Sequence, residues 1–249
     1  MSQKIEQSLL RHSKHDLQKE LIEFLLNNTH PNKKRSIRWK ILLWRFTTTG
    51  AHGLKRSLDI CFSLLFLLIF SPLLLLVTIW IKLDSPGPLI YRQVRVGLNG
   101  RHFNFYKFRS MYFGADKQLQ ELTTHNESTD GVIFKMKKDP RITRPGRLIR
   151  KFSIDELPQL LNVFLGDMSL VGPRPPLPKE VDQYTLDDRK RLNVLPGITG
   201  LWQVSGRSDI PFKEQVELDK KYIQSQSILN DIIIMLRTIP AVLTGRGAY

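Results

Sequence analysis

A long uncharged segment dominates the hydrophobic pattern of the chain. Residues 60–81 carry no charge, and sixteen of these 22 positions are Leu, Ile, Phe or Val. At roughly −0.3 to −0.6 kcal/mol for each such residue near a helix centre, they favour membrane insertion by at most about 5 to 10 kcal/mol. The length and the uniform composition predict a helix embedded in a membrane.

Ser71 and Pro72 lie in the middle of this segment. Proline removes a backbone hydrogen bond at a cost of about 3 kcal/mol or more, so the sequence predicts a bend there. Lys55 and Arg56 precede the segment and Lys82 follows it, so both ends carry the positive charge that is normally kept in the cytoplasm. This symmetry favours a re-entrant hairpin. A kinked helix that crosses the membrane once is the alternative.

Residues 1–50 are predicted to form a separate basic extension. Apolar residues recur at helical spacing over 5–25, and Pro31 ends this pattern. No apolar stretch follows a basic lead at the start, so a cleaved secretory signal is not expected. The next stretch, 33–46, interleaves Lys and Arg with Trp and Phe, which suits an anionic membrane surface. A solvated or partly disordered arm is the alternative.

Shorter patterns predict one domain over residues 51–249. Strands are expected over Ile90–Val96 and Phe103–Phe108, because Asn99 and Gly100 between them form a strong hairpin signal. Helical periodicity predicts four further helices, the last of them in the membrane interface. They are expected around Ala115–Leu122, Leu157–Leu165, Phe212–Gln224 and Ile228–Leu243. The predicted fold class is α+β and mainly helical, with a small β-hairpin.

The charge balance indicates an anionic partner. The chain holds 38 Lys and Arg against 23 Asp and Glu, a net charge of +15, which suits nucleic acid, an anionic membrane face or a phosphate-rich substrate. Its single cysteine, Cys61, excludes an intrachain disulfide framework and a thiolate metal cluster, and favours a reducing setting. No phosphate-loop, dinucleotide-binding or Asp-x-Asp motif is present, which disfavours the standard nucleotide-binding folds.

The densest set of polar residues lies over 139–174, where basic side chains surround the adjacent carboxylates of Asp155 and Glu156. Ser153 and Glu156 have the spacing of a capping box, which is the structural alternative to a catalytic role. Pro158 fits a first helical turn and so favours a cap at Asp155. Both interpretations place Asp155 at a helix start, where the helix dipole and nearby arginines are expected to stabilise its anion as a nucleophile.

The same region predicts an anion site that includes Mg²⁺. Carboxylates of Glu156 and Asp155 are hard oxygen ligands of the kind that Mg²⁺ combines with substrate phosphates. Pro173 and Pro175 fix the backbone on both sides of Arg174, and a rigid loop is the alternative reading of this motif. Donors for a pyrophosphate are expected from several cations, although a surface role is the alternative for any one of them. They are Lys107, Arg109, Arg141, Arg147, Arg150 and Arg174.

At these residues the sequence resembles the bacterial sugar transferase family, the monotopic polyprenyl-phosphate glycosyl-1-phosphate transferases that start capsule, exopolysaccharide and O-antigen repeat units. The resemblance rests on ordered motifs over most of the chain. They are Lys55-Arg56-x-x-Asp59, Ser71-Pro72, Ser85-Pro86-Gly87-Pro88, Tyr91-Arg92-Gln93-x-Arg95-x-Gly97, Tyr106-Lys107-Phe108-Arg109-Ser110-Met111, Asp139-Pro140-Arg141-Ile142-Thr143, Asp155-Glu156-Leu157-Pro158-Gln159, Gly166-Asp167-Met168-Ser169-x-Val171-Gly172-Pro173-Arg174-Pro175 and Pro196-Gly197-Ile198-Thr199-Gly200.

The resemblance implies transfer of a sugar 1-phosphate from a UDP-sugar to polyprenyl (undecaprenyl) phosphate through an aspartyl-phosphate at Asp155. It also implies Mg²⁺ dependence with Glu156, a re-entrant helix broken at Ser71-Pro72, and nucleotide contacts near Pro173-Arg174-Pro175. The segment that ends at Arg207 looks like the hexose-phosphate branch, which adds this arginine to the expected substrate contacts.

The expected location is the bacterial inner membrane, with the catalytic domain facing the cytoplasm. A membrane is therefore an expected partner, nucleic acid is not, and a homo-oligomer is left open. The rival interpretation is a membrane-anchored adaptor that uses the same positive charge to bind nucleic acid or lipid. The sequence leaves the sugar, the polyprenyl length and the pathway open.

Overall fold

The computed structural model describes residues 31–115, 136, 139–245 and 247. It divides into two units, Met1–Lys55 and Arg56–Tyr249. In the first unit the described residues are helical and form the beginning of helix α3 (Pro31–Asp84). The amphipathic helix predicted over 5–25 and all but the first residue of the one predicted over Ala115–Leu122 lie outside the described residues.

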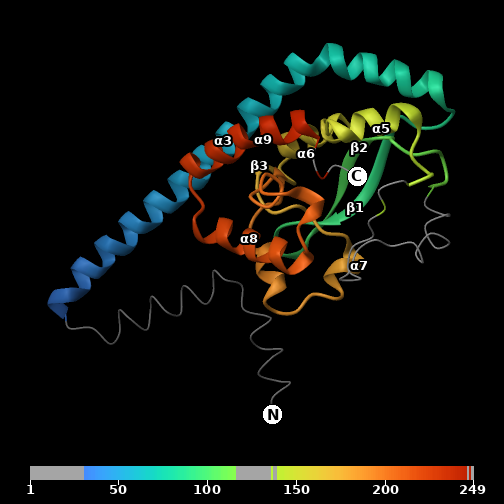
Figure 1. Ribbon diagram of the computed structural model, residues 1–249. Helices are drawn as coiled ribbons and strands as arrows, with labels where there is room; N and C mark the ends of the chain where they lie inside the picture. Colours follow the sequence, from blue (N-terminus) through green and yellow to red (C-terminus); the bar gives the residue numbers. More distant parts are fainter. Residues whose placement is uncertain (1–30, 116–135, 137–138, 246, 248–249) are drawn as a thin grey trace. The chain divides into compact units, whose positions relative to one another are not determined.

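Within the second unit, α3 bends without being interrupted. Pro72 has no N–H to donate to the carbonyl oxygen of Leu68, four residues earlier. The hydroxyl of Ser71 donates to that oxygen instead, at 2.8 Å. The axis of α3 turns between its cyan and teal parts (Figure 1). The predicted bend is confirmed, while a return of the helix to the same membrane face stays a prediction.

The apolar surface of α3 is largely uncovered. Gly53–Asp84 is long and apolar enough to cross a membrane, with a mean hydropathy of 2.8 in its most apolar window. Only 11% of that window is buried inside the protein, whereas a core helix of a soluble protein is mostly buried. Leu68, Leu75 and Leu76 are each more than half exposed. This surface therefore needs an apolar environment outside the described chain.

The β-hairpin follows the prediction closely. Strand β1 (Ile90–Val96) pairs antiparallel with β2 (His102–Phe108), with Val96 opposite His102. The connecting turn places Asn99 at φ 54° and Gly100 at φ 82°, left-handed conformations that asparagine and glycine tolerate better than other residues.

Among the described residues, five further helices and a second small sheet follow the hairpin. The helices are α5 (Arg144–Lys151), α6 (Gln159–Leu165), α7 (Pro178–Val181), α8 (Phe212–Gln224) and α9 (Ile228–Thr244). Helices α8 and α9 match the prediction to within a residue, whereas α5 and α7 were not predicted. Strands β3 (Ser169–Val171) and β4 (Gly197–Thr199) pair in parallel and are too short to give a sequence pattern. The mainly helical α+β class is confirmed.

Two polar side chains at the start of the second unit attach α3 to this domain. Arg56 donates to the carbonyl oxygens of Val163 and Phe164, at 2.6 and 2.8 Å, and so satisfies the last turn of α6. Asp59 accepts the backbone N–H of Leu170 in β3 at 3.0 Å. The motif that contains Arg56 and Asp59 thus fixes α3 against the two elements that follow the predicted carboxylate pair.

Candidate active site

A cavity of about 1190 Å³ lies within the second unit. Its walls come from β1, β2, the end of α5, the loop before α7 and the segment around residue 207. Most of the predicted site residues line it: Lys107, Arg109, Arg141, Arg150, Asp155, Glu156, Arg174, Pro175 and Arg207. Arg147 and Pro173 do not line it. Arg147 is exposed on α5, and Pro173 is buried and accepts a backbone hydrogen bond from Gly197 at 2.8 Å.

The local backbone around the carboxylate pair differs from the prediction. Ser153 takes a left-handed conformation at φ 54°, and Ile154–Glu156 then form a single 3-10 turn. Helix α6 begins only at Gln159, with Pro158 in the preceding position. The capping box at Ser153 is therefore wrong, because its left-handed backbone leaves no side-chain cap. Asp155 does not cap α6 either, because the N-cap of this helix is Pro158.

Helix α6 holds the turn with the carboxylates against the hairpin. The side chain of Asn162 is fully buried and bridges to β2. Its amide donates to the carbonyl of Asn104 at 2.7 Å, and its oxygen accepts the N–H of Tyr106 at 3.1 Å. Because Asn162 lies only seven residues after Asp155, this two-sided contact fixes the turn beside Lys107 of β2.

The two carboxylates differ in their partners. Glu156 accepts from Nη2 of Arg174 at 2.7 Å, and although burial opposes it, this guanidinium holds the pKa of Glu156 below its usual value. Asp155 is 7% exposed and makes no hydrogen bond or ion pair among the described residues. Burial and the charge of Glu156 raise the pKa of Asp155 to about 6, although Lys107 and the arginines act in the opposite direction.

The arginines act on Asp155 in the predicted direction, since Arg150 and Arg174 lower its pKa, but burial and the charge of Glu156 raise that pKa by more. Desolvation outweighs the neighbouring cations, because no donor from the described residues contacts this carboxylate directly. With a pKa about one unit below neutrality, Asp155 is still mostly ionised at pH 7. It is a weakly solvated anion that no described side chain pairs with, which is a favourable state for a nucleophile.

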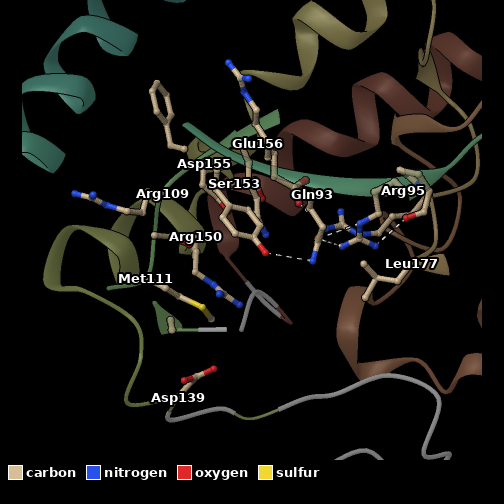
Figure 2. Close-up of a pocket in the computed structure, with 18 of the residues that line it drawn as sticks. Gln93, Arg95, Arg109, Met111, Asp139, Arg150, Ser153, Asp155, Glu156 and Leu177 are labelled. Atoms are coloured by element: carbon tan, nitrogen blue, oxygen red, sulfur yellow. Dashed lines mark hydrogen bonds and ion pairs between the residues drawn. The ribbon is translucent and has the colours of Figure 1, made fainter. Parts of the chain in front are cut away.

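Cations from three elements surround this pair. Burial lowers the pKa of Lys107 in β2 to about 8, in part offset by Asp155, and its ammonium lies 5.4 Å from the ring centre of Tyr91. Arg150 reaches the cavity from the end of α5. Figure 2 shows Asp155, Glu156 and Ser153 gathered together, with Arg109 and Arg150 on one side and Gln93 and Arg95 on the other. An anion with several oxygens fits between them.

Arg207 and Ser153 meet next to the carboxylates. Both are non-glycine residues with φ of 54°, a conformation that carries backbone strain. Nη2 of Arg207 donates to Oγ of Ser153 at 3.2 Å, and burial lowers the pKa of Arg207 even though Glu156 opposes this. The contact ties the segment around Arg207 to the turn that carries Asp155.

Two arginines that were predicted to bind a substrate anion donate hydrogen bonds to groups of the protein itself. Arg109 donates to the carbonyl oxygens of Ser85 and Pro86, at 2.6 and 2.9 Å, at the end of α3. Arg141 binds both carboxylate oxygens of Asp139, through Nε at 2.9 Å and Nη2 at 2.6 Å. Both arginines stabilise local structure beside the cavity, and their contact with a substrate stays a prediction.

Gln93 and Arg95 in β1 are cavity residues that were not predicted as site residues. Arg95 donates to the carbonyl of Pro175 and to Oε1 of Gln93, both at 2.9 Å, and its guanidinium lies 5.3 Å from the ring centre of Phe105. It therefore supports the loop whose Arg174 binds Glu156. Tyr91, Gln93 and Arg95 alternate along the strand and so share one face, a polar period of two that the sequence already contained.

The residues present could hold a Mg²⁺ ion only together with ligands from the substrate. No group of three or more His, Cys, Asp or Glu side chains among the described residues could hold a metal by itself. Asp155 and Glu156 provide two adjacent carboxylates, and Mg²⁺ usually takes one or two of these together with substrate phosphates. Their mutual repulsion, which contributes to the raised pKa of Asp155, is what a bound cation would relieve.

Comparison with known proteins assigns the chain to a family. Residues 50–245 match the family model described as bacterial sugar transferase. Over 78% of its length the chain is 51% identical to a galactosyl transferase CpsE of Streptococcus agalactiae, and over 79% it is 46% identical to an undecaprenyl-phosphate galactose phosphotransferase of Salmonella typhimurium.

These two relatives are longer proteins, of which the aligned part spans only 43% and 42%. An exopolysaccharide production protein ExoY of Sinorhizobium fredii is 42% identical over 78% of the chain, and here the match covers 88% of the relative. The family model thus matches the part of the chain that forms most of α3, the hairpin and nearly all of the cavity wall. The chain therefore belongs to the bacterial sugar transferase family.

Proposed function

We propose that this chain transfers a sugar 1-phosphate, a hexose 1-phosphate, from a UDP-sugar to polyprenyl (undecaprenyl) phosphate, the first membrane step in the assembly of a polysaccharide. The observation that carries the proposal is Asp155, a buried carboxylate in a cavity lined by cations, with no direct partner in the part of the chain that the structure describes. The names of the two longer relatives, a galactosyl transferase and a galactose phosphotransferase, support the choice of a hexose.

The reaction proceeds in two displacements at the sugar-linked phosphorus. In the first, a carboxylate oxygen of Asp155 forms a bond to this phosphorus and the bond to the bridging oxygen breaks, so UMP leaves with that oxygen. In the second, an oxygen of polyprenyl phosphate attacks the same phosphorus and the carboxylate of Asp155 is released. One phosphoanhydride replaces another, and the intermediate is an acyl phosphate.

The other residues of the site neutralise and position charge. Lys107, Arg150 and Arg174 lie around the carboxylates, where they can hold the phosphate oxygens while negative charge moves from the attacking to the leaving oxygen. Glu156, fixed by Arg174, and Asp155 would hold a Mg²⁺ ion together with the substrate phosphates. When bound, this ion supplies positive charge that screens the approach of a carboxylate to a diphosphate.

The proposed location is the bacterial inner membrane, with α3 as a re-entrant anchor and the cavity on the cytoplasmic side. The uncovered apolar surface of Gly53–Asp84 and the basic residues at both of its ends support this. The adaptor interpretation accounts for the same charge. An adaptor that binds anions would gain nothing, however, from the buried carboxylate of Asp155, because its desolvation costs free energy and does not aid the binding of an anion.

A trapping experiment tests the mechanism. The full chain in detergent is incubated with a panel of nucleotide sugars labelled in the sugar-linked phosphate, with Mg²⁺ and without acceptor. We expect release of UMP in an amount equal to the enzyme, and retention of the label in a form that hydroxylamine removes. Asp155→Asn should retain no label, and polyprenyl phosphate should discharge the wild type. Turnover without any covalent label, or a label on Glu156, would overturn the proposed mechanism.

A further inference from the structure

Helix α5 presents positive charge that the described chain does not neutralise. Four of its eight residues are Arg or Lys, and none is acidic. Like charges three or four residues apart on a helix repel each other. The side chains of Arg144 and Arg147 are exposed and, within the described part of the chain, form no hydrogen bond or ion pair. An anionic partner would relieve this repulsion.

The position of α5 next to α3 indicates which kind of anion this helix can bind. Ile149 of α5 packs with Val77 and Ile81 of α3 in one buried cluster, and Figure 1 shows α5 beside the last part of α3. A Cβ at Gly146 would lie 1.9 Å from the carbonyl oxygen of Ser110, so the helix is held closely against the residues that follow β2. Leu148, next to Arg147, is 45% exposed. The basic face therefore lies beside an apolar helix and includes an apolar side chain.

The same helix reaches the cavity. Arg150 follows Arg147 by three residues, which makes the two side chains neighbours on the helix surface. Arg150 lines the cavity, and its charge acts on Asp155. Helix α5 thus connects the region next to α3 with the carboxylate of Asp155, whereas Arg147 itself lies outside the cavity wall.

We infer that Arg144, Arg147 and Leu148 form an acceptor-binding face. This face binds the phosphate of the polyprenyl acceptor first, and the phosphate then moves along the helix to Arg150 at the cavity. This inference rests on the proposed function. The acceptor combines a phosphate with a long apolar chain. This face combines an adjacent apolar helix with guanidinium groups that have no partner among the described residues. The UDP-sugar has no apolar chain, so it matches the cavity but not this face. Arg147 therefore serves the second displacement rather than the first.

The two displacements can be measured separately, which isolates the role of Arg147. We expect Arg147→Gln to raise the KM for polyprenyl phosphate about tenfold, the loss of one charge-assisted hydrogen bond. The burst of UMP released without acceptor should change less than twofold. Arg147→Lys, which keeps the charge, should restore most of the acceptor affinity. Arg101→Gln, at an exposed arginine of the hairpin turn, removes the same charge elsewhere and should leave both quantities unchanged.

Several outcomes would overturn the inference. An unchanged acceptor KM in Arg147→Gln, or an equal rise in Arg101→Gln, would show that this face has no specific role. Weaker sedimentation of Arg147→Gln with phosphatidylglycerol vesicles, at an unchanged acceptor KM, would assign the face to ordinary phospholipid headgroups. If the wild type releases no UMP from any UDP-sugar, the proposed function fails and this inference with it. A wild-type burst with a normal Arg147→Gln variant refutes this inference alone.

Discussion

Two aspartates at opposite ends of α5 are both buried beside the cavity, yet their surroundings differ. Asp139 precedes the helix and accepts from Nε and Nη2 of Arg141, and these two side chains are only 5 and 6% exposed. Although burial opposes it, these hydrogen bonds hold the pKa of Asp139 below its usual value. Asp155 follows the helix without such a partner, and its pKa is raised to about 6. Figure 2 shows Asp139 lying apart from Asp155.

This difference in partners gives the two aspartates different roles, one in stability and the other in the reaction. A buried carboxylate with a bidentate arginine is locked by its own chain, and removing either partner leaves an uncompensated charge. A buried carboxylate that lacks such a partner costs stability but keeps its lone pairs for another reactant. The arginine contacts account for this difference: Arg141 binds Asp139 directly, whereas Arg174 binds Glu156 rather than Asp155.

Removing the unpaired carboxylate should have the largest effect on activity. We expect Asp155→Asn to lower the turnover of UDP-sugar roughly 10⁴-fold or more, because it removes the nucleophile. Turnover is measured as UMP release with polyprenyl phosphate and Mg²⁺. Asp139→Asn is the matched control and, at a temperature where it is folded, should lose less than tenfold. Near-normal turnover of Asp155→Asn would end the assignment of this residue.

The same two variants should change stability in opposite directions. Asp139→Asn leaves Arg141 buried without its anion and should lower the free energy of unfolding by about 3 to 5 kcal/mol at pH 7. The pKa of Asp155 is higher in the folded than in the unfolded chain, so wild-type stability falls as the pH rises from about 4 to 6. Asp155→Asn should therefore be more stable than the wild type at pH 7, by up to about 3 kcal/mol. Denaturant unfolding in detergent at pH 4 and 7 checks both signs.

The pH dependence of the first displacement should have two limbs. Below about pH 6, Asp155 becomes protonated and the rate of UMP release should fall. Above about pH 8, Lys107 loses its proton and its positive charge, so the rate should fall again. Lys107→Arg keeps the charge at high pH, and we expect it to remove the alkaline limb while the acid limb stays. An alkaline limb unchanged in Lys107→Arg would exclude Lys107 as its source.

Sequence patterns predicted the elements that have strong local signals. The hairpin over Ile90–Val96 and the Asn99 turn, and helices α8 and α9, follow from periodicity and turn chemistry alone. Helix α5 was missed because Arg-Pro-Gly at its start is a weak helix former. Its position depends instead on long-range contacts, namely the packing of Ile149 on α3 and the close approach at Gly146.

The sequence predicted which residues belong to the site, but not which of them contact one another. Motif spacing brought Asp155, Glu156 and Arg174 together, and the structure places all three at one cavity. The sign of the pKa shift at Asp155 could not be predicted, because it depends on burial and on which carboxylate the arginine contacts. The roles of Arg109 and Arg141 likewise depend on contacts with carbonyl and carboxylate groups that spacing alone does not reveal.

The smallest expected effect concerns how the unpaired carboxylate is kept in place. Ser153 and Arg207 are both left-handed and hydrogen-bonded to each other, which ties two segments distant in sequence beside Asp155. Ser153→Gly allows the left-handed backbone at lower strain and removes the acceptor oxygen together with its Cβ. We expect kcat to fall about three- to tenfold, the equivalent of one hydrogen bond, with little change in the free energy of unfolding.

A double-mutant cycle distinguishes this role from a general loss of structure. Arg207→Gln removes the donor, and if the two side chains act only through their mutual contact, the double variant should be no slower than Arg207→Gln alone. Ser153→Asn is the matched rescue variant, because asparagine tolerates the left-handed conformation and offers an acceptor oxygen. It should recover part of the lost kcat. Strictly additive effects of Ser153→Gly and Arg207→Gln would instead mean that the contact does not position Asp155, and that Arg207 acts on the substrate by itself.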